Sequence, residues 1–395
     1  MSRIPRGIWV LLSANVVIAL GFGLIAPALP SFARSFDVGY TAVSAVVSAF
    51  AVMRLLFAPT GGRLVARLGE RRVYLGGLLI VAVSTAACAF AQGYVQLLIF
   101  RGLGGIGSTM FTISAMALLI RLSPTEIRGR VAGLFSAGFL IGSITGPLVG
   151  GALVGFGLRL PFLVYAIALV IAALVVATQL GDGGRAPSPT APLGEVLDLR
   201  VALRDSAYRA ILASNLTQGW ASMGVRVAVV PLFITEGLGQ RAAMAGVVLA
   251  VYAVGNVAAI VVAGRVSDSH GRRRVMLPGL VLMAAATAVL GYAPNLVTAL
   301  ALSVVAGIGS GLFAPTHQAA LADVLGSRHQ GGSALAAYGM SSDLGAVTGP
   351  VIVGFVADRA GFGPAFVLTG AVAVLALILW VFARETAPTR QPEAG

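Results

Sequence analysis

The chain has 395 residues, of which 58% are hydrophobic and only 10% charged, whereas soluble domains carry roughly 25% charged residues. This composition excludes a soluble globular protein and predicts a polytopic membrane protein. The formal net charge is +13, but no basic stripe with interleaved aromatic residues is present, so a nucleic-acid partner is not expected. The single cysteine, Cys88, lies in an apolar segment, and we expect no disulfide framework, metal site or cofactor.

Twelve apolar segments are each long enough to cross a bilayer as a helix, because about 20 apolar residues span a hydrocarbon core of about 30 Å. In chain order they are expected at residues 8–30, 42–60, 73–91, 95–120, 131–156, 160–180, 210–235, 245–265, 275–291, 296–322, 333–356 and 364–382. The first segment is longer than the apolar region of a typical signal peptide, and we interpret it as a span.

The 27 residues counted as Lys or Arg are all arginines, and they are distributed unevenly over the predicted loops. Four lie in the loops on one side, namely Arg34, Arg159, Arg241 and Arg359. Three lie inside predicted spans, namely Arg54, Arg101 and Arg226. The remaining twenty lie in the termini or in the loops on the same side as the termini. Because arginines accumulate on the cytoplasmic side of membrane proteins, both termini are predicted to be cytoplasmic.

The sequence before residue 181 is repeated after residue 207. GGRLVARLGERR at 61–72 parallels AGRVSDSHGRRR at 263–274, and TGPLVGG at 145–151 parallels TGPVIVG at 348–354. We therefore expect a six-helix bundle at 1–180 and a second at 208–395. Residues 181–207 are expected to form a cytoplasmic linker that ends in a short amphipathic helix. Duplicated bundles of this kind bind their substrate between the halves, near mid-membrane.

A charged motif occurs in the loop after the second span and again after the eighth. The later copy follows the pattern G-x-x-x-D-x-x-G-R-R with Gly264, Asp268, Gly271, Arg272 and Arg273. The earlier copy has Gly62, Gly69, Arg71 and Arg72, but Ala66 replaces the aspartate and Glu70 replaces the first arginine. We interpret both copies as a conformational gate, in which charged groups at helix ends pair in one state and separate in another. Glu70 is the candidate for the missing carboxylate. The alternative is that these arginines only orient the chain in the membrane.

The fifth span contains the stretch GLFSAGFLIGSITGPLVGG at residues 133–151. In a helix in water each glycine would cost about 1 kcal/mol relative to alanine and the proline about 3 kcal/mol, so the stretch indicates a different environment. Glycines at every fourth residue form a groove without side chains, which allows the first or the eighth span to approach closely. The residues that define the stretch are Gly133, Gly142, Gly146, Pro147, Gly150 and Gly151.

Together these motifs resemble those of the major facilitator superfamily, and the resemblance covers nearly the whole chain. The fourth span adds the pattern R-x-x-x-G-x-G from Arg101, which is common among proton-coupled members. The fifth span matches the complete signature G-x8-G-x3-GP-x2-GG of the drug:proton antiporter branch. The resemblance implies an all-α membrane protein with 12 transmembrane helices in two pseudo-symmetric six-helix bundles, the major facilitator fold.

The resemblance also implies a secondary active transporter of the bacterial inner membrane, functional as a monomer. Such a protein would export small amphipathic or drug-like molecules in exchange for protons by rocker-switch alternating access. Three other functions stay open: a metabolite importer working by symport or uniport, a lipid translocator, and a sensor that transports nothing. An enzyme is not expected, because the sequence offers no nucleophile–histidine–acid set. The expected partners are small molecules and membrane lipids.

Proton coupling requires a titratable group inside the membrane, and the predicted spans contain few ionisable residues. The candidates are Asp343, Arg101, Arg226 and His317. Asp343 is the only carboxylate in the predicted spans and lies roughly 15 Å deep, at about 1.5 Å per residue. We expect it to bind and release the transported proton while it changes its contact with Arg226 or Arg101. The alternative is a permanent ion pair that holds helices together.

The first, fourth, seventh and tenth spans carry the aromatic and amide side chains that we expect around the substrate. These substrate-cavity candidates are Asn15, Phe22, Met110, Phe111, Asn215, Gln218, Trp220, Phe313 and Gln318. The set contains no charged pair. It therefore suits a moderately hydrophobic, neutral or amphipathic molecule better than a sugar, which needs many paired hydroxyl contacts.

Overall fold

A computed structural model describes residues 5–123, 127–180, 199–326 and 332–387, and all regular elements in these ranges are helices. Within these described ranges, eleven helical segments are long and apolar enough to cross a membrane. The all-helical membrane fold expected from the composition is therefore confirmed. Each of the eleven segments corresponds to one expected span, and the seventh expected span is the one without such a counterpart.

The first half of the sequence forms the helices of the first six expected spans. The first span is divided at Pro27 into α1 (Arg6–Ile25) and α2 (Ala28–Arg34), because proline lacks the N–H that would continue the helix. The helices that follow are α3 (Tyr40–Leu68), α4 (Glu70–Ala89), α5 (Tyr94–Leu122), α6 (Arg128–Val154) and α7 (Leu160–Gln179). α3 continues past the apolar span that ends at residue 60, because arginine is a good helix former and keeps its charge in water.

The seventh expected span, residues 210–235, is helical but broken into short pieces. It consists of α9 (Ser206–Thr217), the π-helical segment η2 (Gln218–Val225), α10 (Arg226–Ala228), α11 (Val230–Leu232) and the π-helical segment η3 (Phe233–Gly237). Pro231 contributes to the break, because it has no N–H to donate to the preceding turn. The remaining helices are α12 (Ala242–His270), α13 (Arg272–Leu290), α14 (Leu296–Leu325), α15 (Ser333–Ala360) and α16 (Phe362–Phe382).

The expected linker is described only in its last part, because residues 181–198 lie outside the described ranges. The described part begins with the short helix α8 (Leu199–Ala202), where the amphipathic helix was expected. The backbone N–H of Leu199 donates a 2.9 Å hydrogen bond to the Ser333 hydroxyl at the start of α15. This end of the linker is therefore attached to the second half of the sequence.

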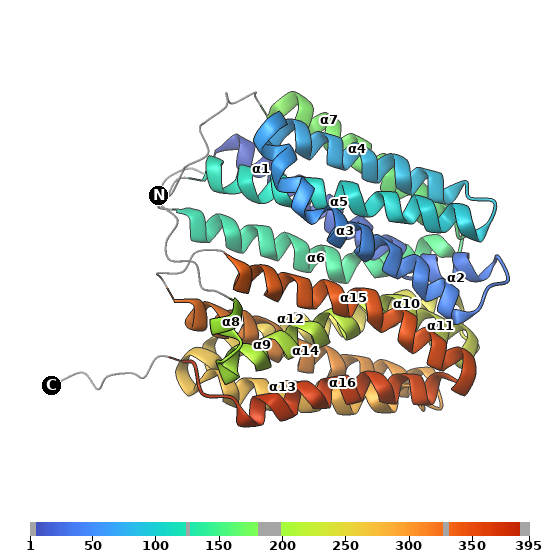
Figure 1. Ribbon diagram of the computed structural model, residues 1–395. Helices are drawn as coiled ribbons and strands as arrows, with labels where there is room; N and C mark the ends of the chain where they lie inside the picture. The colour runs from blue at the N-terminus through green and yellow to red at the C-terminus, as the bar shows by residue number, and fades with distance from the viewer. Residues whose placement is uncertain (1–4, 124–126, 181–198, 327–331, 388–395) are drawn as a thin grey trace. The chain divides into compact units, whose positions relative to one another are not determined.

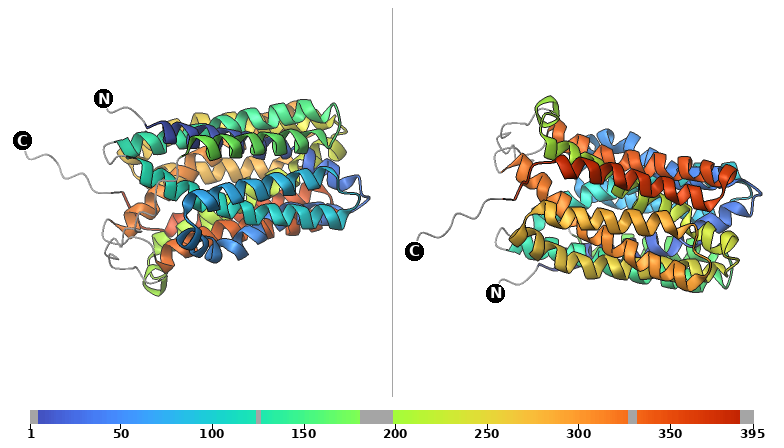
Figure 2. Two further views of the ribbon diagram at one scale, coloured as in Figure 1. Left: turned by 90° about the horizontal axis from the view of Figure 1, so that it is seen from above. Right: turned by 90° about the horizontal axis from the view of Figure 1, so that it is seen from below.

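The helices group into two compact units, each with contributions from several parts of the chain. The first unit contains Met1–Pro189, Arg226–Ala250 and Pro350–Asp358, and the second contains Thr190–Val225, Val251–Gly349 and Arg359–Gly395. In the first unit α1 packs on α6 and α7, and α5 packs on both α3 and α4 (Figure 1). In the second unit α13 packs on both α14 and α16, and the view from below in Figure 2 shows the red helix α16 running alongside orange helices.

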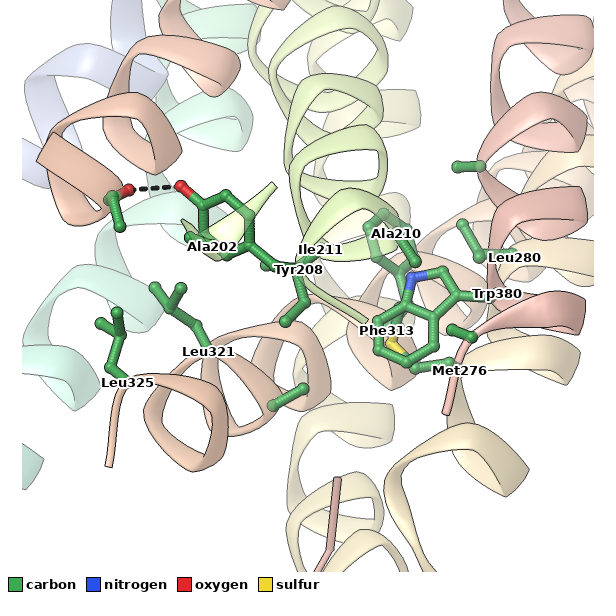
Figure 3. Packing of buried hydrophobic residues seen from close by; sticks show 14 of the residues in the cluster. Ala202, Tyr208, Ala210, Ile211, Met276, Leu280, Phe313, Leu321, Leu325 and Trp380 are labelled. Carbon is green, nitrogen blue, oxygen red and sulfur yellow. Dashed lines mark hydrogen bonds between the residues drawn. The ribbon is translucent and has the colours of Figure 1, made fainter. Parts of the chain in front are cut away.

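The second unit has an apolar core with contributions from α8, α9, η2, α13, α14, α15 and α16 (Figure 3). Tyr208 of α9 and Trp380 of α16 are both fully buried in it. The hydroxyl of Tyr208 donates a 2.6 Å hydrogen bond to the Ala334 carbonyl oxygen of α15. Because the phenol is buried with its hydroxyl paired, Tyr208 contributes both apolar contact area and a fixed contact between α9 and α15.

Candidate functional site

The glycines of the fifth span form a close contact between α6 and α1. A methyl carbon added at Gly146 would lie 2.5 Å from the Leu20 carbonyl oxygen and 2.8 Å from the Cα of Gly23. At Gly142 it would lie 2.6 Å from the Leu20 nitrogen. These distances leave no room for a side chain, so the two backbones touch along this face. Gly133 is different, since nothing lies within 4 Å of a carbon added there.

The last glycine of the signature contacts a helix from the other half of the sequence. A methyl carbon added at Gly151 would lie 2.7 Å from the Ala243 carbonyl oxygen and 3.3 Å from the Cα of Gly246, both on α12. The counterpart of Gly151 in the second half is Gly354 of α15. There the added carbon would lie 2.8 Å from the Tyr40 carbonyl oxygen of α3. The fifth span therefore packs on the first along most of its glycines and on the eighth at its end.

An ion pair joins α2 to η3 beside these glycine contacts. The Arg34 guanidinium donates hydrogen bonds of 2.8 and 2.9 Å to the two carboxylate oxygens of Glu236. Tyr40 donates its hydroxyl to the same carboxylate at 3.0 Å, and the Arg34 guanidinium lies 5.0 Å from the centre of the Tyr40 ring. A bidentate ion pair of this kind restricts the relative orientation of the two side chains and also attracts them electrostatically.

Asp358, near the end of α15, caps the first turn of α3. Its carboxylate accepts hydrogen bonds from the backbone N–H of Tyr40 at 2.7 Å and of Thr41 at 2.8 Å, and from the Thr41 hydroxyl at 2.5 Å. A carboxylate at this position also interacts favourably with the positive end of the helix dipole. We call Arg34, Tyr40, Thr41, Glu236 and Asp358 the α2–α3 clamp.

The sequence analysis did not identify the clamp, although the repeat contains a signal for part of it. Arg34 and Glu236 are 202 residues apart, which is also the shift between the repeated segments GGRLVARLGERR and AGRVSDSHGRRR. Arg34 and Glu236 are therefore equivalent positions of the repeat that carry opposite charges. No comparable signal connects Asp358 with the start of α3.

The later copy of the charged motif forms a network around Arg272, the first residue of α13. Its guanidinium pairs with the Asp323 carboxylate of α14 at 3.0 Å, with the Ser267 hydroxyl at 2.9 Å and with the Asp268 carboxylate. Its backbone N–H donates to the Glu385 carboxylate at 2.8 Å. Asp323 and Glu385 were missed by the sequence analysis, because they lie outside the motif and outside the expected spans.

The earlier copy of the motif also forms an ion pair. The carboxylate of Glu70 lies 3.0 Å from the Nε of Arg121, near the end of α5. The Arg71 guanidinium donates a 2.5 Å hydrogen bond to the Ala177 carbonyl oxygen of α7. Arg121 was not among the expected gate residues. Nothing lies within 4 Å of a carbon added at Gly62, Gly69 or Gly264, and the side chain of Arg72 is exposed.

Two of the proton-coupling candidates belong to the first unit. Arg101 is buried on α5, with a side chain that retains 7% of its exposure, and its guanidinium lies 4.3 Å from the centre of the Phe50 ring of α3. Stacking on an aromatic face is one way to stabilise a buried cation. Arg226 is half-buried in the short helix α10.

The other two candidates belong to the second unit. Asp343 is half-buried on α15, and the carbonyl of the preceding residue, Ser342, packs directly on Gly219 in η2. His317 is 1% exposed, and its ring centre lies 5.9 Å from that of Tyr338 on α15. Among the described residues, no group of three or more His, Cys, Asp and Glu side chains is placed to hold a metal ion.

The amide candidates for the substrate cavity are bound to neighbouring helices. Asn15 donates a 2.8 Å hydrogen bond to the Phe135 carbonyl oxygen, and Asn215 donates one of 2.6 Å to the Tyr338 carbonyl oxygen. The side-chain oxygen of Gln218 accepts a 3.3 Å hydrogen bond from the Ser310 hydroxyl. These amides therefore connect helices within each unit.

The other cavity candidates differ in their exposure. Met110, Trp220 and Phe313 are at most 8% exposed, and Phe313 belongs to the core shown in Figure 3. Phe22 and Phe111 are half-buried, whereas Gln318 is exposed. The candidates that leave side-chain surface available for a ligand are therefore Phe22, Phe111 and Gln318.

A family model described as the Major Facilitator Superfamily matches residues 11–225 and 211–395 of the chain. The chain belongs to this superfamily. It is a multi-pass membrane transporter of small-molecule substrates, and the enzyme class is not supported.

Relatives of this superfamily member include proteins named for drug resistance. Multidrug resistance protein 1 of Bacillus subtilis is 27% identical over 88% of this chain and 89% of the relative. Quinolone resistance protein NorA of Staphylococcus aureus is 30% identical over 44% of this chain and 45% of the relative. Among solved structures, a bacterial homologue of the human lysosomal transporter Spinster has a TM-score of 0.79 and 17% identity, covering 96% of this chain and 97% of that one.

Proposed function

We propose that the chain exports small amphipathic or drug-like molecules across the bacterial inner membrane in exchange for protons, as a monomer. The observation that carries this proposal is its similarity to Multidrug resistance protein 1 over most of both chains. The complete fifth-span signature supports export rather than import. In this proposal both termini are cytoplasmic, and the halves 1–180 and 208–395 alternate access around a central cavity.

The proposal counts the broken helix from α9 to η3 as the seventh of twelve spans. Its two π-helical segments support this role, because π-helical turns frequently occur at functional sites. The α2–α3 clamp and the contacts of Gly151 and Gly354 lie at helix ends that we assign to the non-cytoplasmic side. They consist of hydrogen bonds, ion pairs and close contacts between small residues. When the helices separate, water can form hydrogen bonds to the polar groups that lose their partners. In our proposal these contacts break whenever the transport path opens on that side.

Asp343 is the residue that we propose to bind the coupling proton. It is half-buried on α15, and it is the one carboxylate of the expected spans. It adjoins the contact of Ser342 with η2, so protonation there would change the charge beside the most irregular helix of the second unit. In the proposal Arg226 or Arg101 approaches Asp343 in one state and leaves it in the other.

Inverted membrane vesicles from bacteria that overproduce the chain provide the test. With an inside-acid pH gradient we expect accumulation of ethidium or of a quinolone, and we expect a protonophore to collapse it. Asp343→Asn should abolish gradient-driven accumulation while the purified variant still binds the same compound. Net movement of the compound out of the vesicles would contradict export.

A matched control separates this effect from a general loss of carboxylate charge. Asp37→Asn makes the same chemical change at an exposed loop residue whose φ is 55°, a conformation that asparagine adopts readily. We expect this variant to accumulate the compound as the unmodified protein does. If Asp343→Asn also retained gradient-driven accumulation, Asp343 would not be the proton-binding residue.

A further inference from the structure

The two copies of the charged loop have the same backbone conformation and the same contact with the last helix of their half. Gly69 has φ 84° and ψ 153°, Gly271 has φ 100° and ψ 154°, and each directly precedes a helix. Two residues further on, the guanidinium of Arg71 donates to a backbone carbonyl of α7, and that of Arg273 donates to a backbone carbonyl of α16. The two loops can therefore be compared residue by residue.

The comparison reveals the same ion pair with its charges exchanged. Glu70 occupies the position of Arg272, and Arg121 occupies the position of Asp323, because both members of the pair are shifted by 202 residues. The closest oxygen and nitrogen atoms are 3.0 Å apart in both pairs. The replacement of arginine by Glu70 therefore does not leave the earlier loop without an ion pair, since the partner position has changed sign as well.

The helix dipoles explain a further difference between the loops. Glu70 is the first residue of α4 and Arg121 lies in the last turn of α5, so both charges are favourable at their helix ends. Arg272 and Asp323 occupy the equivalent ends with the unfavourable signs. In the later loop the Glu385 carboxylate accepts hydrogen bonds of 2.8 and 3.1 Å from the first two N–H groups of α13. Glu385 thus supplies the negative charge that Glu70 provides directly.

We propose that Glu70 and Arg121 are the positioning pair of the first half, equivalent to Arg272 and Asp323 but with reversed polarity. The pair connects the start of α4 to the end of α5 and so sets the geometry of the loop that follows α3. This assignment rests on the proposed transport function, in which both loops rearrange during the cycle. It replaces the expectation that Glu70 stands in for the aspartate missing at Ala66.

A charge-swap experiment tests the pairing. The variants are Glu70→Arg, Arg121→Asp and the double variant, each assayed for the maximal rate and KM of export per folded molecule. We expect each single variant to lower the maximal rate about fivefold, the size expected for a partly exposed ion pair, with little change in KM. The double variant restores the pair with the polarity of the second half, and we expect it to recover most of the rate.

Two further measurements make the outcome interpretable. Arg130→Asp changes the charge at an exposed residue at the start of α6, and we expect it to leave the rate unchanged. Hydrogen exchange of the first turn of α4 reports on the loop without any transport assay. We expect faster exchange in both single variants and a return toward the original rate in the double variant.

A double variant that remains as slow as the single variants in both transport and hydrogen exchange would overturn the assignment. Recovered exchange without recovered transport would also overturn it, because the pair would then be structural only. If the unmodified protein moves no test compound, the transport proposal fails. The exchange measurements still decide whether the two residues are coupled.

Discussion

Replacement of Gly146 by alanine should damage the protein far more than the same replacement at Gly133, although both belong to the same signature. A methyl carbon at Gly146 would lie 2.5 Å from the Leu20 carbonyl oxygen, whereas normal contact begins near 3.4 Å. The obstacle is backbone, which cannot rotate away, so α1 and α6 must separate by about 1 Å. Overpacking of this kind costs about 1–3 kcal/mol.

The better helix propensity of alanine offsets only part of that cost, since it contributes at most about 1 kcal/mol. At Gly133 nothing lies within 4 Å of the added carbon, so Gly133→Ala should leave stability unchanged or raise it slightly. The assay is the thermal unfolding midpoint of each purified variant in detergent, together with dye export from whole cells. Equal unfolding midpoints for the two variants would refute the close approach of α6 and α1. Equal loss of export would show that the signature acts through something other than this packing.

Three further outcomes follow from contacts elsewhere in the chain. Asp358→Asn should weaken the hydrogen bonds at the start of α3 by about 1–3 kcal/mol and speed amide exchange at Thr41, and unchanged exchange would argue against the clamp. Partial burial raises the pKa of the Glu385 carboxyl, but its hydrogen bonds with backbone N–H groups outweigh this and hold the pKa below its ordinary value. Glu385→Gln should therefore lower the unfolding midpoint at neutral pH, with the difference vanishing as the pH falls below about 4. Tyr208→Phe removes a buried 2.6 Å hydrogen bond to Ala334 and should cost about 1–3 kcal/mol in a denaturant titration, with export per folded molecule preserved.

Local features of the sequence were sufficient to predict most of the helices. Length and hydropathy located all eleven long apolar helices, because the bilayer requires long apolar segments whatever their tertiary contacts. The break of the first span at Pro27 has an equally local cause, although the sequence analysis expected one span over residues 8–30. The division of the seventh span into α9, η2, α10, α11 and η3 was not predicted, since its hydropathy resembles that of an unbroken helix.

The candidate site was predictable only where one short stretch contains the whole signal. The glycines of the fifth span predicted a close helix contact. Which of them contact α1 and which contact α12 depends on the rotation of α6 about its axis. The pairing of Glu70 with Arg121 was not anticipated, because Arg121 lies 51 residues away and belongs to no motif. The pairing could be recognised only when the distances in both loops were compared.

The amino-acid order alone determined that this chain is a duplicated helical membrane protein with the motifs of its superfamily. Composition, motif spacing and internal repetition can be read from the sequence without knowledge of the fold. The tertiary structure decided which charges meet, as in the pairing of Arg34 with Glu236 and the capping of α3 by Asp358. The physical reason is range: hydrophobic burial acts on every apolar segment, whereas a hydrogen bond or ion pair depends on a few ångströms between residues hundreds of positions apart.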